Sequence, residues 1–445
     1  MSQSQTPSSR SSRNPRRRSR GPSRPQSPQP HSRSGHAPDL ASRFTHTTSD
    51  APPIAFEELG LDARLNQAVA DRGFTSTTGI QTGAIPLVLE GVDLVACAQT
   101  GTGKTAAFLL PTLHRLLQSA EPRTSTRVLV LAPTRELAVQ IGEDCEGFAY
   151  HTDLSVGTIY GGVGSGPQFR ALEAPADVIV ATPGRLLDLM ATGSAKFSGV
   201  EVLVLDEADR LLDMGFWPDV RRIVSTLPAS RQTLFFSATT SQDVWSAALS
   251  IMSDPVCLQV GGAGGPATTI THQVHHVDTP GAKTDWLAHF LRATNTPTIV
   301  FVETKRKADR VARRLAAAGI RCATLHADRS QSQRAAAVEG FRAGRHRTLV
   351  ATDIAARGLD IEGIGHVINY EPPSSPDAYV HRVGRTGRAQ AEGVALTLVG
   401  PDEAGAFAEL QRALRFALTP CAPQDPVTGG PSGRERSLRL VSPAA

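Results

Sequence analysis

Short apolar runs alternate with polar segments of helix length along the chain from about Phe56 onward. Four of these runs, "RVLVLAPT", "ADVIVATPGR", "VEVLVLDEAD" and "QTLFFSATT", are rich in the aliphatic residues that buried strands favour. Strands that alternate with helices in this way predict βαβ units and a parallel sheet. In such a sheet we expect the functional loops at the carboxyl ends of the strands.

A second series of the same kind follows a glycine-rich stretch. The segment "GGAGGPATT" begins at residue 261 and predicts a flexible linker over residues 261–270. Beyond it, "TIVFV", "RCATLHAD", "HRTLVATD", "GHVINY" and "GVALTLV" are strand-like, and Ala308, Val311 and Leu315 fall on one face of a helix. The sequence therefore predicts two α/β domains, over residues 53–260 and 271–418.

Both ends of the chain lack this periodicity. Residues 1–52 consist largely of Ser, Pro and Arg, and residues 419–445 begin with the loose stretch "TPCAPQDPVTGGPSG". Segments with so little apolar surface to bury do not fold alone, so we expect both to be disordered. The prolines and the missing apolar residues also argue against an amphipathic transit peptide at the start of the chain.

Composition and charge narrow the class of protein. With 40% hydrophobic and 20% charged residues, the chain has the composition of a soluble globular protein. No apolar run approaches the roughly 18 residues that cross a bilayer, so we expect no membrane segment. The five cysteines show no CxxC spacing, which favours reduced thiols in a cytoplasmic protein.

The formal net charge of +4 is unevenly distributed. Residues 1–50 contain nine arginines and two aspartates, a charge of +7, whereas the rest of the chain sums to −3. The basic balance therefore belongs to one arm, which predicts contacts with a polyanion.

Three carboxylates follow one predicted strand within four positions. Asp206, Glu207 and Asp209 end the apolar run "VEVLVL". Acids also favour the first turn of a helix, and that simpler interpretation explains one or two of them. Three like charges packed together cost free energy unless a cation or a proton-transfer role compensates them.

A second stretch supplies a ligand for these acids. In "DLVACAQTGTGKTAAFLLP", Gly101, Gly103, Lys104 and Thr105 follow a strand and open a helix, as in a phosphate-binding loop. Lys104 would reach the β- and γ-phosphates of a nucleoside triphosphate, and the Thr105 hydroxyl would bind magnesium. Asp206 could then hold the ion through its waters, and Glu207 could orient and deprotonate the attacking water.

Together with "PTRELA", "TPGR", "SAT", "ATDIAARGLDI" and "HRVGRTGR", these motifs resemble those of the DEAD-box ATP-dependent RNA helicases. The resemblance covers residues 54 to 415 and is strongest to bacterial proteins of the RhlE-like kind. It implies two RecA-like parallel-sheet domains in tandem, ATP and Mg²⁺ as cofactors, and RNA as the partner. The RNA contacts that the resemblance implies are made to the RNA backbone, which carries little sequence information.

The activity that the resemblance implies is an RNA-dependent ATPase whose domains close on RNA and ATP. Closure would unwind short duplexes locally and non-processively, or remodel RNA–protein complexes. One alternative is an ATP-gated RNA clamp or assembly platform in which unwinding is incidental. Another is a DNA-translocating helicase, which would discriminate poorly between RNA and DNA. We expect a cytoplasmic monomer.

The resemblance also assigns site residues by position. Nucleotide binding falls to Phe56, Gln81, Ala98, Gln99, Thr100, Gly101, Thr102, Gly103, Lys104, Thr105 and Asp360, and catalysis to Lys104, Asp206, Glu207, Arg385 and Arg388, with magnesium on Thr105 and Asp206. The coupling residues are Asp209, Ser237, Thr239 and His381, and the RNA contacts are Arg135, Gly162, Thr182, Arg185, Arg334 and Thr352.

One loop departs from the family pattern. Upstream of Gln81 the chain reads "TTGIQ", so that Thr77 and Gly79 stand where the family usually has two prolines. Each proline would fix a φ angle and restrict the residue before it. We therefore expect this adenine-recognition loop to be less pre-organised than usual.

Overall fold

The computed structural model describes residues 44–48, 52–98, 101–119, 124–163, 168, 176–193, 197–260, 269–279, 281–356, 363–387, 392–414 and 418–420. Every described residue lies in one compact unit, Leu40–Ala445. Most residues of the predicted tails, 1–52 and 419–445, and of the predicted linker, 261–270, lie outside the described ranges.

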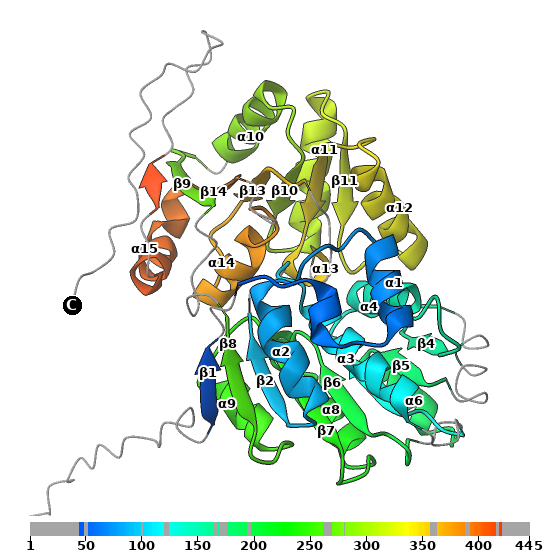
Figure 1. Cartoon of the computed structure of the whole chain (residues 1–445). Coiled ribbons are helices and arrows are strands. Elements are labelled where there is room, and N and C mark those ends of the chain that lie inside the picture. The colour runs from blue at the N-terminus through cyan, green and yellow to red at the C-terminus, as the bar shows by residue number, and fades with distance from the viewer. Residues whose placement is uncertain are drawn as a thin grey trace, which may run out of the picture. The chain divides into compact units, whose positions relative to one another are not determined.

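Eight described strands form the first sheet, all parallel, in the order β1-β8-β2-β7-β6-β3-β5-β4 (Figure 1). These strands are β1 (Thr45–Thr48), β2 (Leu94–Cys97), β3 (Val128–Leu131), β4 (Val156–Ile159), β5 (Val178–Ala181), β6 (Val202–Leu205), β7 (Gln232–Ser237) and β8 (Val256–Gln259). The helices of this domain are η2 (Phe56–Leu59), α1 (Ala63–Asp71), α2 (Gly79–Leu89), α3 (Lys104–Gln118), α4 (Arg135–Phe148), α6 (Pro183–Met190), α7 (Ala208–Asp213), α8 (Trp217–Val224) and α9 (Gln242–Leu249).

The second sheet has seven described strands, also parallel, in the order β11-β12-β10-β13-β14-β9-β15. They are β9 (Ile270–His276), β10 (Thr298–Phe301), β11 (Cys322–Leu325), β12 (Thr348–Ala351), β13 (His366–Asn369), β14 (Gly393–Val399) and β15 (Thr419–Pro420). The helices are α10 (Ala282–Ala293), α11 (Lys305–Ala317), α12 (Gln331–Arg342), α13 (Asp353–Ala356), α14 (Pro376–Val383), η4 (Pro401–Glu403) and α15 (Ala404–Ala413). Two parallel-sheet α/β domains in tandem confirm the predicted fold class.

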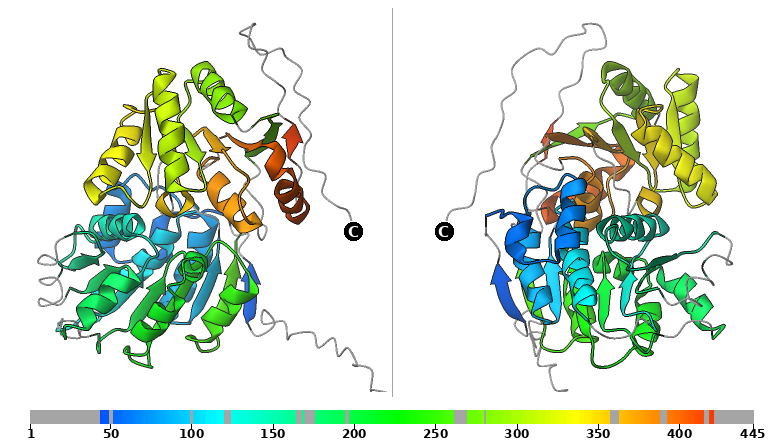
Figure 2. Two further views of the ribbon diagram at one scale, coloured as in Figure 1. Left: turned by 180° about the vertical axis from the view of Figure 1, so that it is seen from behind. Right: turned by 45° about the vertical axis from the view of Figure 1, so that its right-hand side comes forward.

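The first sheet is buried on both faces. In β3, Val128 and Val130 point into one hydrophobic cluster, whereas Leu129 and Leu131 point into another. Residues of α1 to α4 complete the first cluster and residues of α6 to α9 the second, so helices cover both faces (Figure 2). This explains why the strands are apolar throughout rather than alternating.

The ends of the two domains differ from the sequence prediction. Thr45–Thr48, assigned to the basic tail, form β1 on the edge of the first sheet, and buried Phe44 stacks on Trp245 at 4.7 Å between ring centroids. Thr419–Pro420, assigned to the other tail, pair with β9, and Ile270, assigned to the linker, begins β9. A few residues with one buried aromatic or aliphatic side chain can add an edge strand. A strand this short leaves no periodic pattern in the sequence that would predict it.

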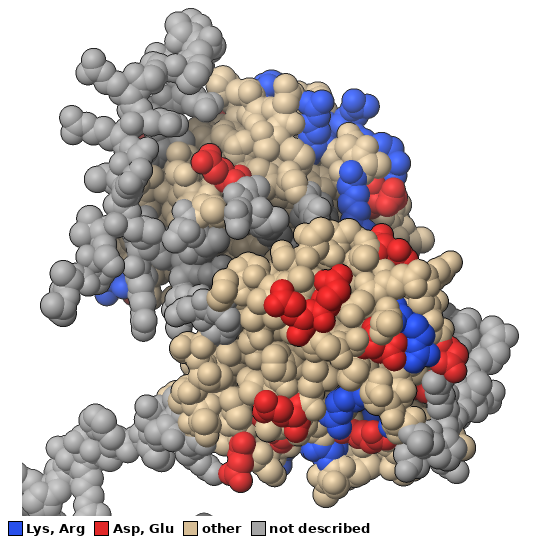
Figure 3. Space-filling view, viewed as in Figure 1, with Lys and Arg blue, Asp and Glu red and all other residues tan. Residues whose placement is uncertain are grey.

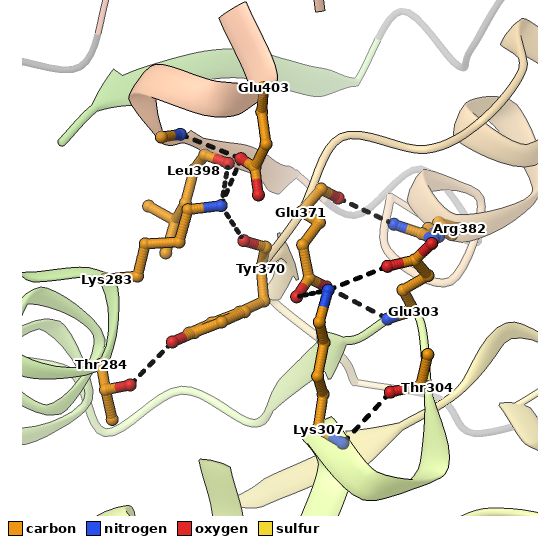
Figure 4. A network of polar contacts seen from close by, with 11 residues as sticks. Lys283, Thr284, Glu303, Thr304, Lys307, Tyr370, Glu371, Arg382, Leu398 and Glu403 are labelled. Atoms are coloured by element: carbon orange, nitrogen blue, oxygen red, sulfur yellow. Dashed lines mark hydrogen bonds and ion pairs between the residues drawn. The ribbon is translucent and has the colours of Figure 1, made fainter. Parts of the chain in front are cut away.

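A buried lysine holds the carboxyl ends of two strands in the second domain (Figure 4). Lys283 of α10 is 3% exposed, and its Nζ donates to the carbonyl oxygen of Tyr370 at 2.7 Å and of Leu398 at 3.1 Å. It also contacts the carboxylate of Glu403. A buried ammonium is tolerated because acceptors surround it, and these bonds tie the chain after β13 to β14.

No helix among the described residues is both long enough and apolar enough to cross a membrane.

We expect a half-buried histidine on β9 to make the stability of the second domain sensitive to acid. The Nδ1 atom of His272 lies 2.9 Å from the hydroxyl of Tyr379 on α14. Burial lowers the pKa of His272 to about 4, from an ordinary value of 6.5. The unfolded chain therefore takes up a proton near pH 6.5 that the folded domain resists, so stability falls as the pH falls from about 6.5 toward 4.

We predict that His272→Gln flattens this dependence, because the glutamine amide does not titrate but can still bond the Tyr379 hydroxyl. Between pH 7 and pH 5 the wild-type protein should lose about 2 kcal/mol of unfolding free energy through this residue, and the variant should not. Denaturant unfolding at both pH values measures the difference. Equal losses in the two proteins would contradict the assignment.

Candidate active site

The predicted nucleotide-site residues follow three adjacent strands of the first sheet. In the order β2-β7-β6, Ala98, Ser237 and Asp206 stand at or directly after the carboxyl ends. These ends meet at one edge because every strand of the sheet is parallel. The fold thereby brings together motifs that are far apart in the sequence.

The loop between β2 and α3 has the backbone of an anion-binding loop. Gly101 and Gly103 have φ angles of 82° and 88°, a region that glycine enters without strain. Lys104, the first residue of α3, is buried, and its Nζ donates to the Ala98 carbonyl oxygen at 2.9 Å. An ammonium and a helix N-terminus at one place favour a phosphate.

Asp206 is a buried carboxylate with few partners. It is 3% exposed and accepts a hydrogen bond from the N–H of Glu207 at 2.9 Å. Burial raises the pKa of Asp206 to about 6, although the charge of Lys104 acts in the opposite direction. A cation placed against this carboxylate would therefore be strongly stabilised.

The oxygen donors at this position fit a magnesium ion. Asp206 supplies a desolvated carboxylate, and Thr105, the second residue of α3, supplies a hydroxyl, both of the hard-oxygen type that Mg²⁺ prefers. Within the described residues no group of three or more His, Cys, Asp or Glu could hold a metal.

Glu207 combines a strained backbone with a stabilised charge. Its φ and ψ angles are 48° and 50°, a left-handed conformation that is costly outside glycine. Its Oε2 lies 3.0 Å from Nη1 of Arg210, which is 1% exposed. Burial works to raise the pKa of Glu207, but the charges of Arg210, Arg385 and Lys104 outweigh it and lower the pKa. The carboxylate is thus ionised at neutral pH, as a general base must be.

Asp209 contacts both domains. Its Oδ2 accepts a hydrogen bond from the N–H of Ala238 at 3.1 Å and lies 3.4 Å from Nε2 of His381 on α14. Burial acts to raise the pKa of Asp209, but the contact with His381 outweighs it, so that the pKa is lowered. The hydroxyl of Ser237 donates to the Thr239 carbonyl oxygen at 2.9 Å. The backbone of the "SAT" motif, rather than its hydroxyls, therefore meets Asp209.

Gln81 lies between the adenine-recognition loop and the phosphate loop. It is 1% exposed, accepts a hydrogen bond from Thr78 N–H at 2.9 Å, and donates from Nε2 to the Gly103 carbonyl oxygen at 3.1 Å. The Thr78 hydroxyl donates to the Thr102 carbonyl oxygen at 2.7 Å. Phe56, predicted to bind the nucleotide, is 2% exposed and packs edge-on against Phe74.

The structure shows what holds this loop at the position where the family usually has its first proline. Thr77 is 2% exposed and exchanges two hydrogen bonds with Ile54, from Thr77 N–H to the Ile54 carbonyl at 2.8 Å and from Ile54 N–H to the Thr77 hydroxyl at 2.9 Å. Backbone and side-chain bonds hold the position that a proline ring would otherwise restrict. Sequence analysis missed this contact because the partner lies 23 residues upstream, and the looser loop stays a prediction.

Two buried arginines of the second domain lie in or near α14. Arg385 was predicted as a site residue, and Arg382 was not. Arg385 is 3% exposed and donates from Nε to the His381 carbonyl oxygen at 3.3 Å. Arg382, which the sequence analysis did not assign to the site, is buried and forms two hydrogen bonds to Asp353, at 2.6 and 2.7 Å. It also donates to the Glu371 carbonyl oxygen at 3.1 Å, so it anchors α14 and the residues that α14 carries.

The predicted RNA contacts of the first domain occupy the other half of the same edge. They follow β3, β5 and β4, which are neighbours in that order. Arg135 begins α4 after β3, Thr182 and Arg185 follow β5, and Gly162 follows β4. A Cβ on Gly162, whose φ is 84°, would stand 2.1 Å from Nη1 of Arg135, so a glycine is required for that guanidinium to lie there.

In the second domain, the predicted contacts Arg334 and Thr352 lie in α12 and directly after β12. Arg334 pairs with a carboxylate of the first domain: its Nε and Nη2 lie 2.8 and 2.7 Å from Oε1 of Glu136 on α4. The predicted residues Gln99, Thr100, Asp360 and Arg388 lie outside the described residues.

One basic surface escaped the sequence prediction. On the face shown in Figure 3, Lys and Arg gather over the end of the second domain that carries α11 and α12. The basic residues of α11 are Lys305, Arg306, Lys307, Arg310, Arg313 and Arg314. The run "KRKADRVARR" carried this signal, because its apolar residues occupy one helical face and leave the cations on the other.

Comparison with known proteins agrees with this geometry. The family described as DEAD/DEAH box helicase matches residues 78–246, and the family described as helicase conserved C-terminal domain matches residues 282–390. The chain is 43% identical over 357 residues to the ATP-dependent RNA helicase RhlB of Pseudomonas syringae pv. tomato, covering 78% of this chain and 89% of that protein. It is 40% identical over 369 residues to the ATP-dependent RNA helicase CshA of Listeria monocytogenes, covering 82% and 70%.

Solved structures show the same architecture. Dbp5 of S. cerevisiae bound to RNA and ADP BeF3 matches with a TM-score of 0.76 and 30% identity, covering 82% of this chain and 95% of that one. Mss116p bound to ssRNA and AMP-PNP matches with a TM-score of 0.76 and 26% identity, covering 84% and 82%. The RhlE-like subgroup stays a prediction. From its two matched domains and these relatives, the chain belongs to the DEAD-box family of ATP-dependent RNA helicases.

Proposed function

We propose that this protein hydrolyses ATP when RNA is bound, and that closure of its two domains separates short RNA duplexes locally and without processive movement. One observation carries the proposal. The acids of the first domain meet groups of the second, since Asp209 lies 3.4 Å from His381 and the charge of Arg385 acts on Glu207. Hydrolysis would then depend on how the two domains meet.

In this proposal the first domain binds the nucleotide and prepares the water. Lys104 and the N-terminus of α3 bind the phosphates, and Gln81 recognises the adenine. Glu207 accepts the proton of the attacking water, because its carboxylate is ionised and buried. Arg385 stabilises the charge that develops on the transferred phosphoryl group, and Arg388 is proposed to act with it.

Thr105 and Asp206 would hold the magnesium ion, in accord with their hard oxygen atoms and the raised pKa of Asp206. When bound, Mg²⁺ supplies charge that offsets the phosphate oxygens. We place the activity in the cytoplasm and assign it to a monomer; the free thiols of Cys97, Cys145, Cys257 and Cys322, within the described chain, fit a reducing compartment.

RNA is proposed to lie along the edge formed by the loops after β3, β5 and β4 and to continue over α12. Arg135 and Arg185 supply cations, and Gly162 lets the backbone approach a phosphate closely. The solved relatives bound to RNA and a nucleotide analogue support RNA as the ligand. Such contacts read shape and charge rather than base sequence.

The proposal is tested by comparing strand release with the lifetime of the RNA complex. With ATP, a labelled strand of a short duplex should be released within one binding event, and release should fall as the duplex lengthens. A long-lived RNA complex without strand release would favour an ATP-gated clamp. Equal stimulation of ATPase activity by DNA and RNA would favour a DNA-translocating helicase.

We predict that Glu207→Gln traps the protein on RNA. The substitution keeps the size of the side chain but removes the base, so turnover should fall by about 100-fold or more while ATP and RNA still bind. Dissociation of labelled RNA in the presence of ATP measures the effect. Glu143→Gln, an exposed acid of α4, is the matched control. If Glu207→Gln releases RNA as fast as wild type, Glu207 is not the base.

We also predict that the arginine arm strengthens RNA binding through charge. Eight of the nine arginines of residues 1–50 lie in residues 2–40, and deletion of 2–40 leaves Phe44 and β1 in place. RNA affinity should fall, and its salt dependence should flatten by about 0.7 log unit per log unit of salt for each phosphate that the arm no longer neutralises. ATP turnover at saturating RNA should stay near normal.

RNA binding titrations at several salt concentrations measure that slope. A full-length variant with the eight arginines replaced by serine separates charge from length, and it should behave like the deletion. An unchanged slope in both variants would mean that the arm serves only solubility.

A further inference from the structure

The loop that leads into α2, and so to Gln81, is hydrogen-bonded to a segment more than twenty residues upstream. Thr77 N–H donates to the Ile54 carbonyl oxygen at 2.8 Å, and Ile54 N–H donates to the Thr77 hydroxyl at 2.9 Å. The pair closes a small ring of two hydrogen bonds between chain segments of no regular secondary structure. Such a ring fixes both segments at once, because each supplies a donor and an acceptor.

The same hydroxyl continues into the loop. The oxygen of Thr77 lies 2.7 Å from the Thr82 hydroxyl, which in turn lies 3.1 Å from the Thr78 carbonyl oxygen. One chain of hydrogen bonds satisfies every group. The Ile54 N–H donates to the Thr77 hydroxyl, that hydroxyl donates to the Thr82 hydroxyl, and the Thr82 hydroxyl donates to the Thr78 carbonyl oxygen. Thr77 is 2% exposed, so water does not readily replace these bonds.

From Thr78 the network reaches the nucleotide site. Thr78 N–H donates to Gln81 Oε1 at 2.9 Å, and the Thr78 hydroxyl donates to the Thr102 carbonyl oxygen at 2.7 Å. Gln81 Nε2 donates to the Gly103 carbonyl oxygen at 3.1 Å. The orientation of the Gln81 amide thus depends on the position of Thr78. Thr78 in turn directly follows Thr77, which is bonded to Ile54.

Gly79 stands where there is little room for a side chain. A Cβ at Gly79 would stand 3.0 Å from Cγ1 of Val260, directly after β8. Proline suits the first position of a helix, which Gly79 occupies in α2, but its ring would press on Val260. At position 77 a proline would remove the N–H that bonds the Ile54 carbonyl.

We propose that Thr77 is a positioning residue for nucleotide recognition: with Ile54 it forms a clasp that holds the loop from which Gln81 meets the base. This inference rests on the proposed function, because it assumes that ATP binds at Gln81. The clasp consists of Ile54, Thr77 and Thr82. It acts on binding of the base and not on the chemistry at Glu207.

Three substitutions test the clasp. Thr77→Val keeps the shape and removes the hydroxyl, Thr77→Pro removes the hydroxyl and the N–H, and Thr77→Ser keeps both. Thr77→Val should raise the KM for ATP about three- to tenfold, the range expected for one buried hydrogen bond, with kcat within about twofold of wild type. Thr77→Pro should raise the KM at least as much. Thr77→Ser should match wild type.

Hydrogen exchange supplies a readout that needs no ATP. The Ile54 amide should exchange faster in Thr77→Val and Thr77→Pro but not in Thr77→Ser. Thr226→Val, which removes a hydroxyl bond to the Ile223 carbonyl in the same domain, is the control and should change neither KM nor the Ile54 amide.

The outcomes separate the clasp from the proposed function. A wild-type protein that turns over ATP while Thr77→Val keeps the wild-type KM would overturn the role of Thr77 alone. A fall in kcat with no change in KM would also overturn it. A wild-type protein that neither binds nor hydrolyses ATP in the presence of RNA would overturn the proposed function and the role of Thr77 with it.

Discussion

A parallel sheet buried on both faces leaves one edge for chemistry, and the site of this protein depends on that constraint. The central strands β2, β3, β5 and β6 are apolar along their length, because helices cover both sides. The polar side chains of the site begin where the strands end. The carboxyl ends of β2, β7 and β6 therefore gather the nucleotide-site residues, and those of β3, β5 and β4 gather the proposed RNA contacts.

Burial at this edge makes the partner of each acid decisive. Glu207 faces Arg210, and Asp209 faces His381, so both carboxylates are held in the charged form. Asp206 accepts a hydrogen bond from the Glu207 N–H and lies in the field of the Lys104 charge. Burial outweighs both, and the pKa of Asp206 is raised. Three neighbouring carboxylates thus differ in character because their environments differ, which fits the three different roles proposed for them.

The second domain contributes groups whose positions depend on two buried cations. Arg382 joins α14 to Asp353 and to the chain after β13, and Lys283 joins that chain to β14. His381 stands on α14 and Arg385 follows shortly after its end, so the contact with Asp209 depends on the bonds that Arg382 makes.

Local patterns along the chain were enough to predict the class of fold, the phosphate loop, the three acids and the family. Apolar periodicity and motif spacing are properties of short segments, and they can be recognised without the partners of those segments. The same patterns gave no sign of β1, of the burial of Arg382, of the contact of Arg334 with Glu136, or of the clasp between Thr77 and Ile54. Each of those depends on a donor meeting an acceptor, or an edge meeting a strand, across a long separation in sequence. Such contacts are decided by the tertiary structure. A hydrogen bond of about 3 Å requires both partners to be in the right positions, and the residue types alone do not specify those positions.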